Sequence, residues 1–430
     1  MADITIDGAA VNELHGVAPA RGLVWTSPSV GYIFYIDNGS DFVYKKTTDS
    51  GQTWDTTPTD IRSGAVLRYA IWFDKWTNGD SGELIHIFFV DTADDDITYV
   101  TLDTSDDTLS SDTVVNSGVG VSADTTYGRV YGDLAAVKAR GGNMYVGGWI
   151  DNDGEHFFYK STSAPYSSWS SIADPCEGNQ VDRIIACCGG ETDSNDFLLF
   201  YADVSALEVT VKTYDQSGDS WSESSKIGDL SAFNVSMWDA VDRHSDNHVI
   251  LVHHETSGAS LTPDPPIKCV DVTNGTTWTT KTDVFASDFI YGMVGVLINQ
   301  QNDDIYVAYS DNQSLGDIYY KKSDDGGSTW GTATQLTVTA DDHRHIWGGT
   351  SVDDNGGRFM PCWFNDDLND VVTNYDNSVA IAAATGGTNM QINISDSWKS
   401  ISGMQLQVAD SWRQVSSAKI NIGDAWKTIY

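Results

Sequence analysis

The chain has 430 residues, of which 40% are hydrophobic and 11% aromatic, so it contains enough apolar material for a large buried core. Asp and Glu number 61 against 24 Lys and Arg, and the formal net charge is −37. A field of that sign repels nucleic acid and anionic membrane surfaces, which excludes both as general partners.

The acidic balance has two explanations. The charge is typical of a protein that is soluble in high salt, where screening shortens the Debye length to roughly 3 Å at 1 M. Alternatively, the Asp residues are mainly turn residues that also bind Ca²⁺. We favour the halophilic explanation, because Lys is scarce while acidic residues are abundant. We expect no cofactor, with Ca²⁺ as the single ion that the turns would accept.

Residues 1–16 contain neither a basic n-region nor an apolar h-region, and no run reaches the roughly 18 apolar residues of a membrane span. The cysteines are odd in number and show no CxxC spacing; they are Cys176, Cys187, Cys188, Cys269 and Cys362. This usage predicts free thiols in a reducing compartment, with a bridge from Cys176 to Cys187 or Cys188 left open. We therefore expect assembly in the cytoplasm, without a signal peptide or membrane insertion.

Seven segments share one form, an apolar or aromatic strand that runs into an acidic turn. They recur about every 55 residues, at 32–37, 85–91, 144–151, 197–203, 249–255, 305–311 and 359–365. Each follows a shorter apolar strand, at 22–26, 69–73, 134–137, 184–188, 235–238, 293–298 and 346–350. Each also precedes an alternating strand, such as 42–47, 157–161, 209–214 and 318–322, and in most units a fourth strand starts around a Trp.

Four short strands per unit predict one blade of a β-propeller, because a single twisted antiparallel sheet must stack on neighbours to cover its faces. The seven units predict an all-β fold in which residues 1–385 form a seven-bladed propeller of four-stranded blades. The seventh unit lacks an obvious fourth strand, whereas residues 3–7 form a lone strand before the first unit. We predict that this N-terminal strand pairs into the last blade and closes the ring, which removes an exposed edge.

Two turns between third and fourth strands fit the pattern S/T-x-D-x-G-x-T-W, at residues 47–54 and 323–330. In such a turn Asp accepts backbone N–H bonds, Gly adopts a positive φ and Trp packs between sheets. The pattern resembles the Asp-box (BNR) repeat of sialidase-like propellers, and degenerate copies end at Trp169, Trp221 and Trp278. The resemblance implies a structural role for Asp49, Gly51, Trp54, Asp325, Gly327 and Trp330.

Five arginines stand at or near the starts of the shorter, innermost strands, which converge on one mouth of the ring. These candidate ligand-binding residues are Arg21, Arg68, Arg129, Arg183 and Arg344. Arg binds carboxylate and sulfate bidentately, so the set would suit an anionic glycan; the alternative is that these arginines neutralise crowded Asp.

Catalysis of the sialidase kind is disfavoured. Sialidases resemble this chain in their Asp-boxes, but they have six blades, and their Arg-Ile-Pro start is replaced here by Arg21-Gly22-Leu23. No Tyr/Glu nucleophile pair can be placed, and we assign no catalytic residue. His253-His254 and His343–His345 would supply a base for a seven-bladed polysaccharide lyase, but neighbouring residues of a strand point to opposite faces. The acidic turns 151–154 and 353–356 lack the full ligand series of a Ca²⁺ loop.

Residues 386–430 differ in character, because one unit occurs three times with its Trp at steps of 14 (412 − 398 and 426 − 412). Each unit alternates apolar and polar residues, turns through three polar residues and continues as Trp-Lys/Arg, which predicts a hairpin. About 40 residues make a thin core, so we expect Trp398, Trp412 and Trp426 to pack against other copies, the propeller or another protein. The repeat resembles C-terminal repeats of fibre and minor tail proteins of tailed viruses.

This resemblance implies a structural protein on the virion surface of a tailed virus, with a haloarchaeal host where the acidity is halophilic. The tail would oligomerise the chain or anchor it to other virion proteins of a tail fibre or capsid turret. The propeller would be displayed for binding to a receptor or glycan of the host surface. The alternative is a carbohydrate-active enzyme, a polysaccharide lyase or glycosidase, acting at the Arg-lined mouth. A third interpretation is an architectural protein without a ligand.

Overall fold

The computed structural model describes most of the propeller and the backbone of the tail strands. The described residues are 3–8, 21–64, 66–91, 93–94, 96–117, 134–149, 156–173, 175, 181–191, 193–203, 206, 208–222, 225–229, 238–254, 266–285, 294–310, 316–338, 341, 343–348, 350–365, 367–384, 390–394, 397–401, 405–408, 411–414, 419–422 and 425–428. By backbone contacts, residues 1–382 and 383–430 form two separate compact units.

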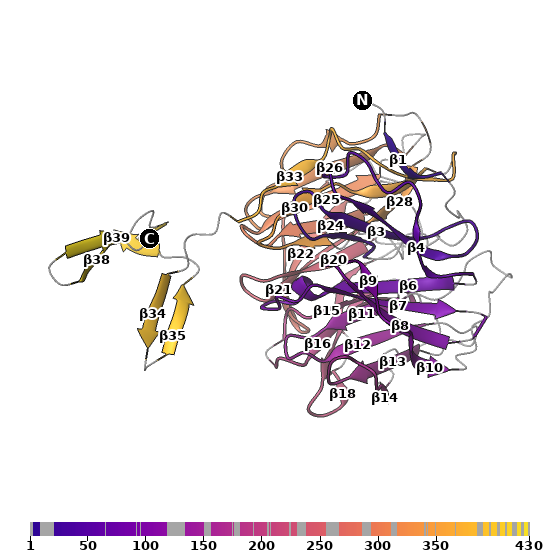
Figure 1. The fold of residues 1–430 in the computed structure, drawn as a ribbon, viewed down its shortest axis with the longest axis horizontal. Helices are drawn as coiled ribbons and strands as arrows, with labels where there is room; N and C mark the ends of the chain where they lie inside the picture. The colour runs from indigo at the N-terminus through magenta and orange to yellow at the C-terminus, as the bar shows by residue number, and fades with distance from the viewer. Residues whose placement is uncertain are drawn as a thin grey trace. The chain divides into compact units, whose positions relative to one another are not determined.

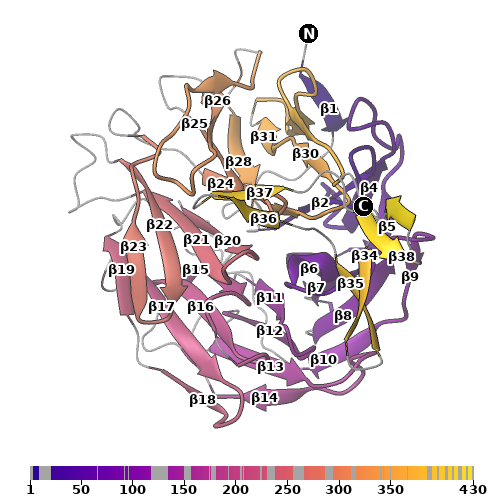
Figure 2. The same cartoon turned by 90° about the vertical axis from the view of Figure 1, so that its left-hand side faces the viewer.

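The first unit is an all-β, seven-bladed propeller, which confirms the predicted fold class, and Figures 1 and 2 show its blades arranged in a ring. From the centre outward, blade one consists of β2 (Leu23–Trp25), β3 (Gly31–Ile36), β4 (Phe42–Thr47) and β5 (Thr59–Arg62). Blade two consists of β6 (Val66–Phe73), β7 (Leu84–Asp91), β8 (Asp96–Asp103) and β10 (Thr113–Ser117), with β9 (Thr108–Leu109) beside β8. Blade three consists of β11 (Leu134–Lys138), β12 (Met144–Trp149), β13 (His156–Ser161) and β14 (Ser170–Ile172).

Blades four to seven follow the same plan. Blade four consists of β15 (Val181–Cys187), β16 (Phe197–Asp203) and β17 (Glu208–Asp215) with β18 (Ser220–Trp221) and β19 (Ser225–Asp229), and blade five of β20 (Trp238–Arg243), β21 (His248–His254), β22 (Ile267–Asn274) and β23 (Thr277–Thr280). Blade six consists of β24 (Val294–Asn299), β25 (Asp304–Ser310), β26 (Ile318–Ser323) and β27 (Thr334–Gln335). Blade seven consists of β28 (His343–Trp347), β31 (Cys362–Asn365), β32 (Asp370–Thr373) and β1 (Ile4–Asp7). A 3-10 turn, η2 (Asp74–Trp76), is the only helix in the described part, and no helix there is long and apolar enough to span a membrane.

The core lies between the blades, because both faces of each sheet are covered. Strand β3 is buried at every position. Its residues Tyr32 and Phe34 belong to the apolar cluster shared with blade two, whereas Ile33 and Tyr35 belong to the cluster shared with blade seven. Successive side chains of a strand point to opposite faces, so a nearly continuous apolar run serves two neighbouring interfaces.

The first strand of the chain is the outermost strand of the last blade. In β1, Ile4 pairs with Thr373 and Thr5 with Val372 of β32. Ile6 is 4% exposed and packs in the cluster between blades seven and one. Lys45 of blade one donates to the carbonyl oxygen of Ile6 at 2.7 Å. The strand therefore covers the outer edge of β32.

One predicted strand is displaced. The innermost strand of blade five was expected at 235–238, but β20 begins at Trp238 and continues through two carboxylates. Asp239 accepts the backbone N–H of Val296 at 2.8 Å, and Asp242 accepts that of Gly189 at 2.6 Å, so neighbouring blades satisfy both charges. Because each buried carboxylate accepts a hydrogen bond from a neighbouring blade, Asp can lie within a strand here instead of ending it.

The expected strands 346–350 and 359–365 of blade seven are each split. β28 ends at Trp347, and the chain then forms β29 (Thr350–Val352), which pairs in parallel with β24 on the inner edge of blade six. Phe359 belongs to β30 (Gly357–Phe359), which pairs with β33 (Val379–Ile381), and β31 starts only after Pro361. Pro lacks the N–H that a central strand needs, which explains the interruption.

The second unit contains three hairpins, as the repeat predicts. They are β34 (Met390–Ile394) with β35 (Ser397–Ile401), β36 (Gln405–Val408) with β37 (Ser411–Gln414), and β38 (Lys419–Ile422) with β39 (Ala425–Thr428). Each Trp faces an amide residue across its hairpin: Asn393 pairs with Trp398, Gln407 with Trp412 and Asn421 with Trp426. Ile394 pairs with Ser397, and the predicted three-residue turn between them lies outside the described residues.

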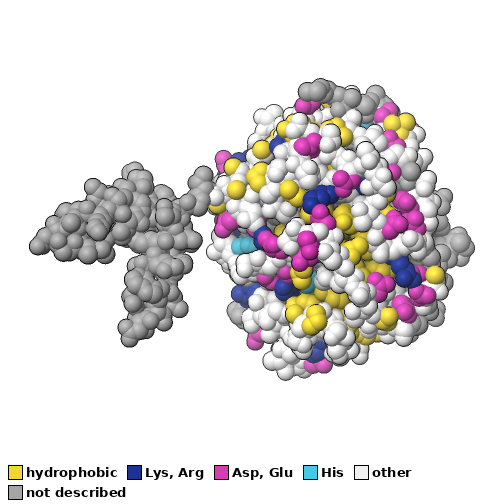
Figure 3. Space-filling view, in the orientation of Figure 1, with side chains coloured by type: hydrophobic (Ala, Val, Ile, Leu, Met, Phe, Trp, Pro, Cys, Tyr) yellow, Lys and Arg dark blue, Asp and Glu magenta, His cyan; other side chains and the backbone are white. Residues whose placement is uncertain are grey.

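Many of the aspartates organise turns. The carboxylate of Asp37 accepts the backbone N–H groups of Gly39 and Asp41, and that of Asp103 accepts the N–H of Ser105. Others lie beside cations, and Figure 3 shows Lys and Arg side chains among the Asp and Glu side chains of one face. The Lys46–Asp107 pair at 2.7 Å joins blades one and two. Turn chemistry therefore explains part of the acidic composition.

Candidate functional site

Arg21 lies at the centre of the ring, although the sequence suggested an open mouth. It precedes β2, and its guanidinium donates to the carbonyl oxygen of Ala186 at 2.8 Å and to that of Ala240 at 3.5 Å. The guanidinium carbon lies 4.6 Å from the ring centroid of Trp72. Arg21 is 6% exposed, so it joins blade one to blades four and five and has no side that could receive a ligand freely.

The structure does not gather the other four arginines into a described anion site. Arg68, in β6, is buried. Arg183 and Arg344 lie in β15 and β28, of which the backbone is described at these positions, and Arg129 lies outside the described residues. The two arginines whose side chains are described are therefore both part of the packed interior.

The two S/T-x-D-x-G-x-T-W turns share one hydrogen-bond pattern. Asp49 accepts the backbone N–H of Thr53 at 2.9 Å, and Gly51 has a φ of 86° with its N–H on the Thr47 hydroxyl at 2.8 Å. Trp54 packs edge-on against Trp25. The second turn repeats this with Asp325 on the N–H of Thr329 at 2.8 Å and Gly327 at a φ of 86°, while the Trp330 indole donates to the Thr282 carbonyl oxygen.

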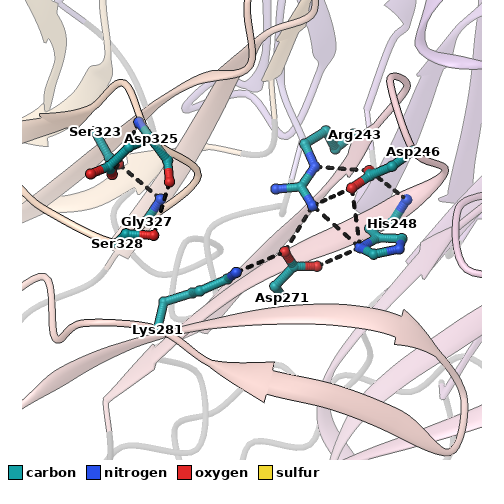
Figure 4. A network of polar contacts seen from close by, with 9 residues as sticks. All are labelled: Arg243, Asp246, His248, Asp271, Lys281, Ser323, Asp325, Gly327 and Ser328. Atoms are coloured by element: carbon teal, nitrogen blue, oxygen red, sulfur yellow. Dashed lines mark hydrogen bonds and ion pairs between the residues drawn. The ribbon is translucent and has the colours of Figure 1, made fainter. Parts of the chain in front are cut away.

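A charged network lies beside the second turn, on blade five (Figure 4). Arg243 donates to Asp246 and to Asp271, and His248 and Lys281 contact the Asp271 carboxylate as well. These charges are paired with one another, so the Arg243 guanidinium is already neutralised by Asp246 and Asp271. The contacts described for both turns and for this network are made within the propeller.

The loops that follow the innermost strands are cross-linked at one end of the ring. Residues 74–83 join β6 to β7 and reach blades five and seven. There, the Trp76 indole donates to the Ser351 carbonyl oxygen at 3.1 Å, and the Asn78 amide donates to the His244 carbonyl oxygen at 2.8 Å. Gln300 of blade six donates to the Ser351 hydroxyl at 2.8 Å. These bonds join loops of blades two, five, six and seven to one another.

A polar cleft of about 570 Å³ lies on these cross-linked loops. Its lining comes from blades two, five, six and seven and consists of Lys75, Thr77, Asn78, Gly79, Asp80, Ser81, His244, Gln300, Asp353, Asp354 and Asn355. The volume falls in the range of about 300–1,000 Å³ that is usual for small-molecule sites. It is far larger than the cavity of about 20 Å³ next to Arg21.

The charges of the cleft are mostly paired. The Lys75 ammonium lies 3.9 Å from Asp353, and Lys138 pairs with Asp80 at 2.7 Å. Burial raises the pKa of the Asp353 carboxyl, while the N–H of Asn355 at 3.0 Å opposes this rise. Asp354 is exposed. Of the described lining residues, three are carboxylates and one is a lysine, so the cleft has a negative balance.

Three of the four histidines proposed as bases are buried elsewhere, and the side chain of His345 lies outside the described residues. His253 and His254 are 1% and 0% exposed in β21, and His343 is 1% exposed in β28. None of the three lines the cleft. Among the described residues, no group of three or more His, Cys, Asp or Glu is placed to hold a metal ion.

Sequence reasoning missed the cleft because its residues come from four separate polar loops, each of which has the composition of an ordinary turn. The one available signal was the length of the loop 74–83, compared with 244–247 between β20 and β21. A long loop at the mouth of a propeller is a usual place for function.

No protein-family model matches the chain, and no curated protein matches it. Among solved structures, a polysaccharide lyase described as an ulvan lyase bound to -[GlcA(1-4)Rha3S]- is 11% identical, with 89% of this chain and 95% of that chain covered and a TM-score of 0.49. A six-bladed fungal lectin of Aleuria aurantia is 13% identical over 73% of this chain and 96% of that chain, with a TM-score of 0.42. Hydrazine synthase of Kuenenia stuttgartiensis is 10% identical over 86% and 98%, with a TM-score of 0.51. At such identities the likeness concerns the fold alone.

Proposed function

We propose that the propeller is a carbohydrate-binding module and that the cleft binds an uncharged saccharide. The observation that carries this proposal is the cleft of about 570 Å³ itself, which is built by loops of four blades. Its loops are tied to one another by hydrogen bonds, so the site is preformed. A preformed site loses little free energy to ordering when it binds.

The chemistry of the lining suits sugar hydroxyls. A hydroxyl both donates and accepts, and the cleft offers amides at Asn78 and Asn355 together with carboxylates at Asp80 and Asp354. Amides match either role, and carboxylates accept only.

The charge of the cleft selects the class of sugar. Lys75 and Lys138 are already engaged by Asp353 and Asp80, so neither is a spare cation for a uronate or sulfate. The exposed Asp354 and the net charge of −37 repel anions. We therefore replace the anionic glycan expected from the arginine pattern with an uncharged one.

A printed array of uncharged, carboxylated and sulfated oligosaccharides tests this proposal with the full-length protein. We expect binding to uncharged sugars, and a loss of about tenfold or more in Asn78→Ala and Asn355→Ala, since each removes a hydrogen-bonding amide. Asn116→Ala, on the outer strand β10, is the matched control and should bind as the wild type does. Absence of binding to every sugar, or equal binding by the cleft variants, would overturn the proposal.

We also propose that the three-hairpin tail assembles or anchors the chain on the surface of a virion, where the propeller is displayed to the host. Three points support this role: the resemblance of the repeat to virus tail proteins, the equivalent register of the three hairpins, and the marginal stability of an isolated hairpin. Mass photometry of the full-length protein beside a chain ending at Gly386 tests it. A defined oligomer that becomes monomeric without the tail is expected; monomers in both cases would contradict self-assembly.

A further inference from the structure

The loop 74–83 supplies much of the cleft lining and is held by one buried carboxylate. Lys75, Thr77, Asn78, Gly79, Asp80 and Ser81 all belong to this loop. Asp74 is 2% exposed, and its Oδ2 atom accepts the backbone N–H of Leu84 at 3.0 Å. The side chain of the first loop residue thus bonds to the residue that follows the loop. Gly82 gives this carboxylate room, since a Cβ there would lie 2.1 Å from Asp74 Oδ2.

Asp74 is in turn held by His86 of β7, which is fully buried. The Nε2 atom of His86 lies 2.8 Å from Oδ1 of Asp74, and its Nδ1 lies 2.8 Å from the hydroxyl of Tyr99. A carboxylate can only accept, so Nε2 carries the proton and Nδ1 accepts from the Tyr99 hydroxyl. Burial lowers the pKa of His86, opposed by Asp74, which agrees with this neutral tautomer. The Tyr166 ring packs edge-on against the imidazole at 5.5 Å.

Lys138 of β11 extends the same chain of contacts into the cleft. Its ammonium pairs with Asp74 and, at 2.7 Å, with Asp80 of the lining. Its backbone carbonyl oxygen accepts the Thr77 hydroxyl at 2.7 Å. The loop is therefore fixed at its start by Asp74, in its middle by Thr77 and Asp80, and at its end by Leu84.

We propose that His86 is a positioning residue for the cleft: through Asp74 and Lys138 it holds the loop 74–83 in the conformation that presents Asn78 and Asp80 to a bound saccharide. His86 does not line the cleft, so it acts without touching the sugar. This inference rests on the proposed carbohydrate binding. In metal sites, residues that hold a ligand through a hydrogen bond change affinity by about 10- to 100-fold when they are removed, and the same reasoning applies to a site held by a loop.

Two substitutions at position 86 separate positioning from packing. In His86→Leu the side chain still fills apolar space but cannot bond to Asp74, whereas in His86→Gln an amide N–H can still reach it. We expect His86→Leu to raise amide hydrogen exchange in residues 74–84 at least about tenfold and to weaken binding on the array of uncharged oligosaccharides about tenfold. His86→Gln should restore both to within about threefold of the wild type.

Lys138→Met provides an independent variant, because Lys138 is only partly buried and its loss leaves the His86 site packed. It should produce the same local rise in exchange, with unchanged exchange in blades four and five. A folded His86→Leu protein with wild-type exchange in residues 74–84 and wild-type array binding would overturn the inference. Failure of the proposed carbohydrate binding would give another result. Asn78→Ala would then leave binding on the array unchanged, while His86→Leu would still raise hydrogen exchange in residues 74–84.

Discussion

The guanidinium of Arg21 lies over the indole of Trp72, with 4.6 Å between the guanidinium carbon and the ring centroid. Trp72 is fully buried in the innermost strand of blade two, and Arg21 belongs to the segment that leads into blade one. From this position Arg21 donates to backbone carbonyl oxygens of blades four and five. One side chain thus joins four blades across the centre of the ring.

Arg21→Met should therefore destabilise the propeller. Met keeps the length of the side chain but leaves the carbonyl oxygens of Ala186 and Ala240 without their donor, and it removes the cation from Trp72. We expect the free energy of unfolding to fall by about 3 kcal/mol in a guanidinium titration. Lys226→Met, at an exposed position of blade four, should leave the titration unchanged. Equal midpoints for Arg21→Met and the wild type would show that the buried cation contributes nothing net.

Ile6→Ala tests the contribution of the N-terminal strand. Ile6 is 4% exposed between blades seven and one, so the truncation leaves a cavity and should cost about 2–3 kcal/mol of unfolding free energy. Thr5→Ala, one residue away on the exposed face of the same strand, should cost far less. Thermal unfolding of the two variants side by side measures the difference. A similar loss in both would mean that backbone pairing, and not the Ile6 side chain, holds the strand.

His254 predicts a loss of stability in acid. Burial lowers its pKa to about 4, with a smaller contribution from His253, and neither ring nitrogen has a hydrogen-bond partner among the described residues. The unfolded chain takes up this proton near pH 6.5, so the contribution to stability is complete above that pH. It is lost as the pH falls from about 6.5 to 4, by roughly 3 kcal/mol.

Unfolding titrations of the wild type and of His254→Leu between pH 4 and 7 measure this contribution. The stability of the variant should depend less on pH by that amount, because Leu has no proton to take up. Parallel curves for the two proteins would contradict the burial of a neutral imidazole.

Glu191 predicts a change of the opposite sign. Burial raises its pKa to about 7, while the Thr213 hydroxyl, which donates to the carboxylate at 2.9 Å, opposes the rise. A carboxyl with a raised pKa contributes stability below its unfolded pKa of about 4.5 and loses it as the pH rises through 7. Glu191→Gln stays neutral and still accepts from Thr213. At pH 8 it should be more stable than the wild type by about 2 kcal/mol, with no gain at pH 4.5, as denaturant midpoints would show. A constant difference at both values would assign the effect to packing.

The ring could be predicted because its period is carried by buried strands. Phe34, Phe88 and Leu199 lie in second strands that must be apolar on both faces, and this requirement repeats in every blade. The innermost strand of blade five escaped prediction since Asp239 and Asp242 resemble turn residues. Only the N–H groups of other blades, far away in the sequence, make them strand residues. Pro361 is a signal for a break in the strand, but the apolar residues on both sides of it favoured one continuous strand over 359–365.

The cleft could not be predicted from local patterns. Asn78, His244 and Asp353 are each ordinary in their own loops, and they meet only because the ring brings blades two, five and seven together. The arginine pattern was misleading for a related reason. Arg21 marks the start of an innermost strand, but Trp72 and the carbonyl oxygens opposite it are invisible until the blades are assembled.

The pairing of Ile4 with Thr373 also sets an order of events during synthesis. The ribosome releases β1 first, but its partner β32 emerges only after six complete blades have been made, so the ring cannot lock before nearly the whole propeller exists. Joining segments so distant in sequence is slow, and until then the nascent chain is an open arc with a free edge at each end. A chain that terminates before residue 373 would remain such an arc and be exposed to aggregation. The tail, in contrast, is synthesised after β32, when the propeller already has every strand that it needs to close.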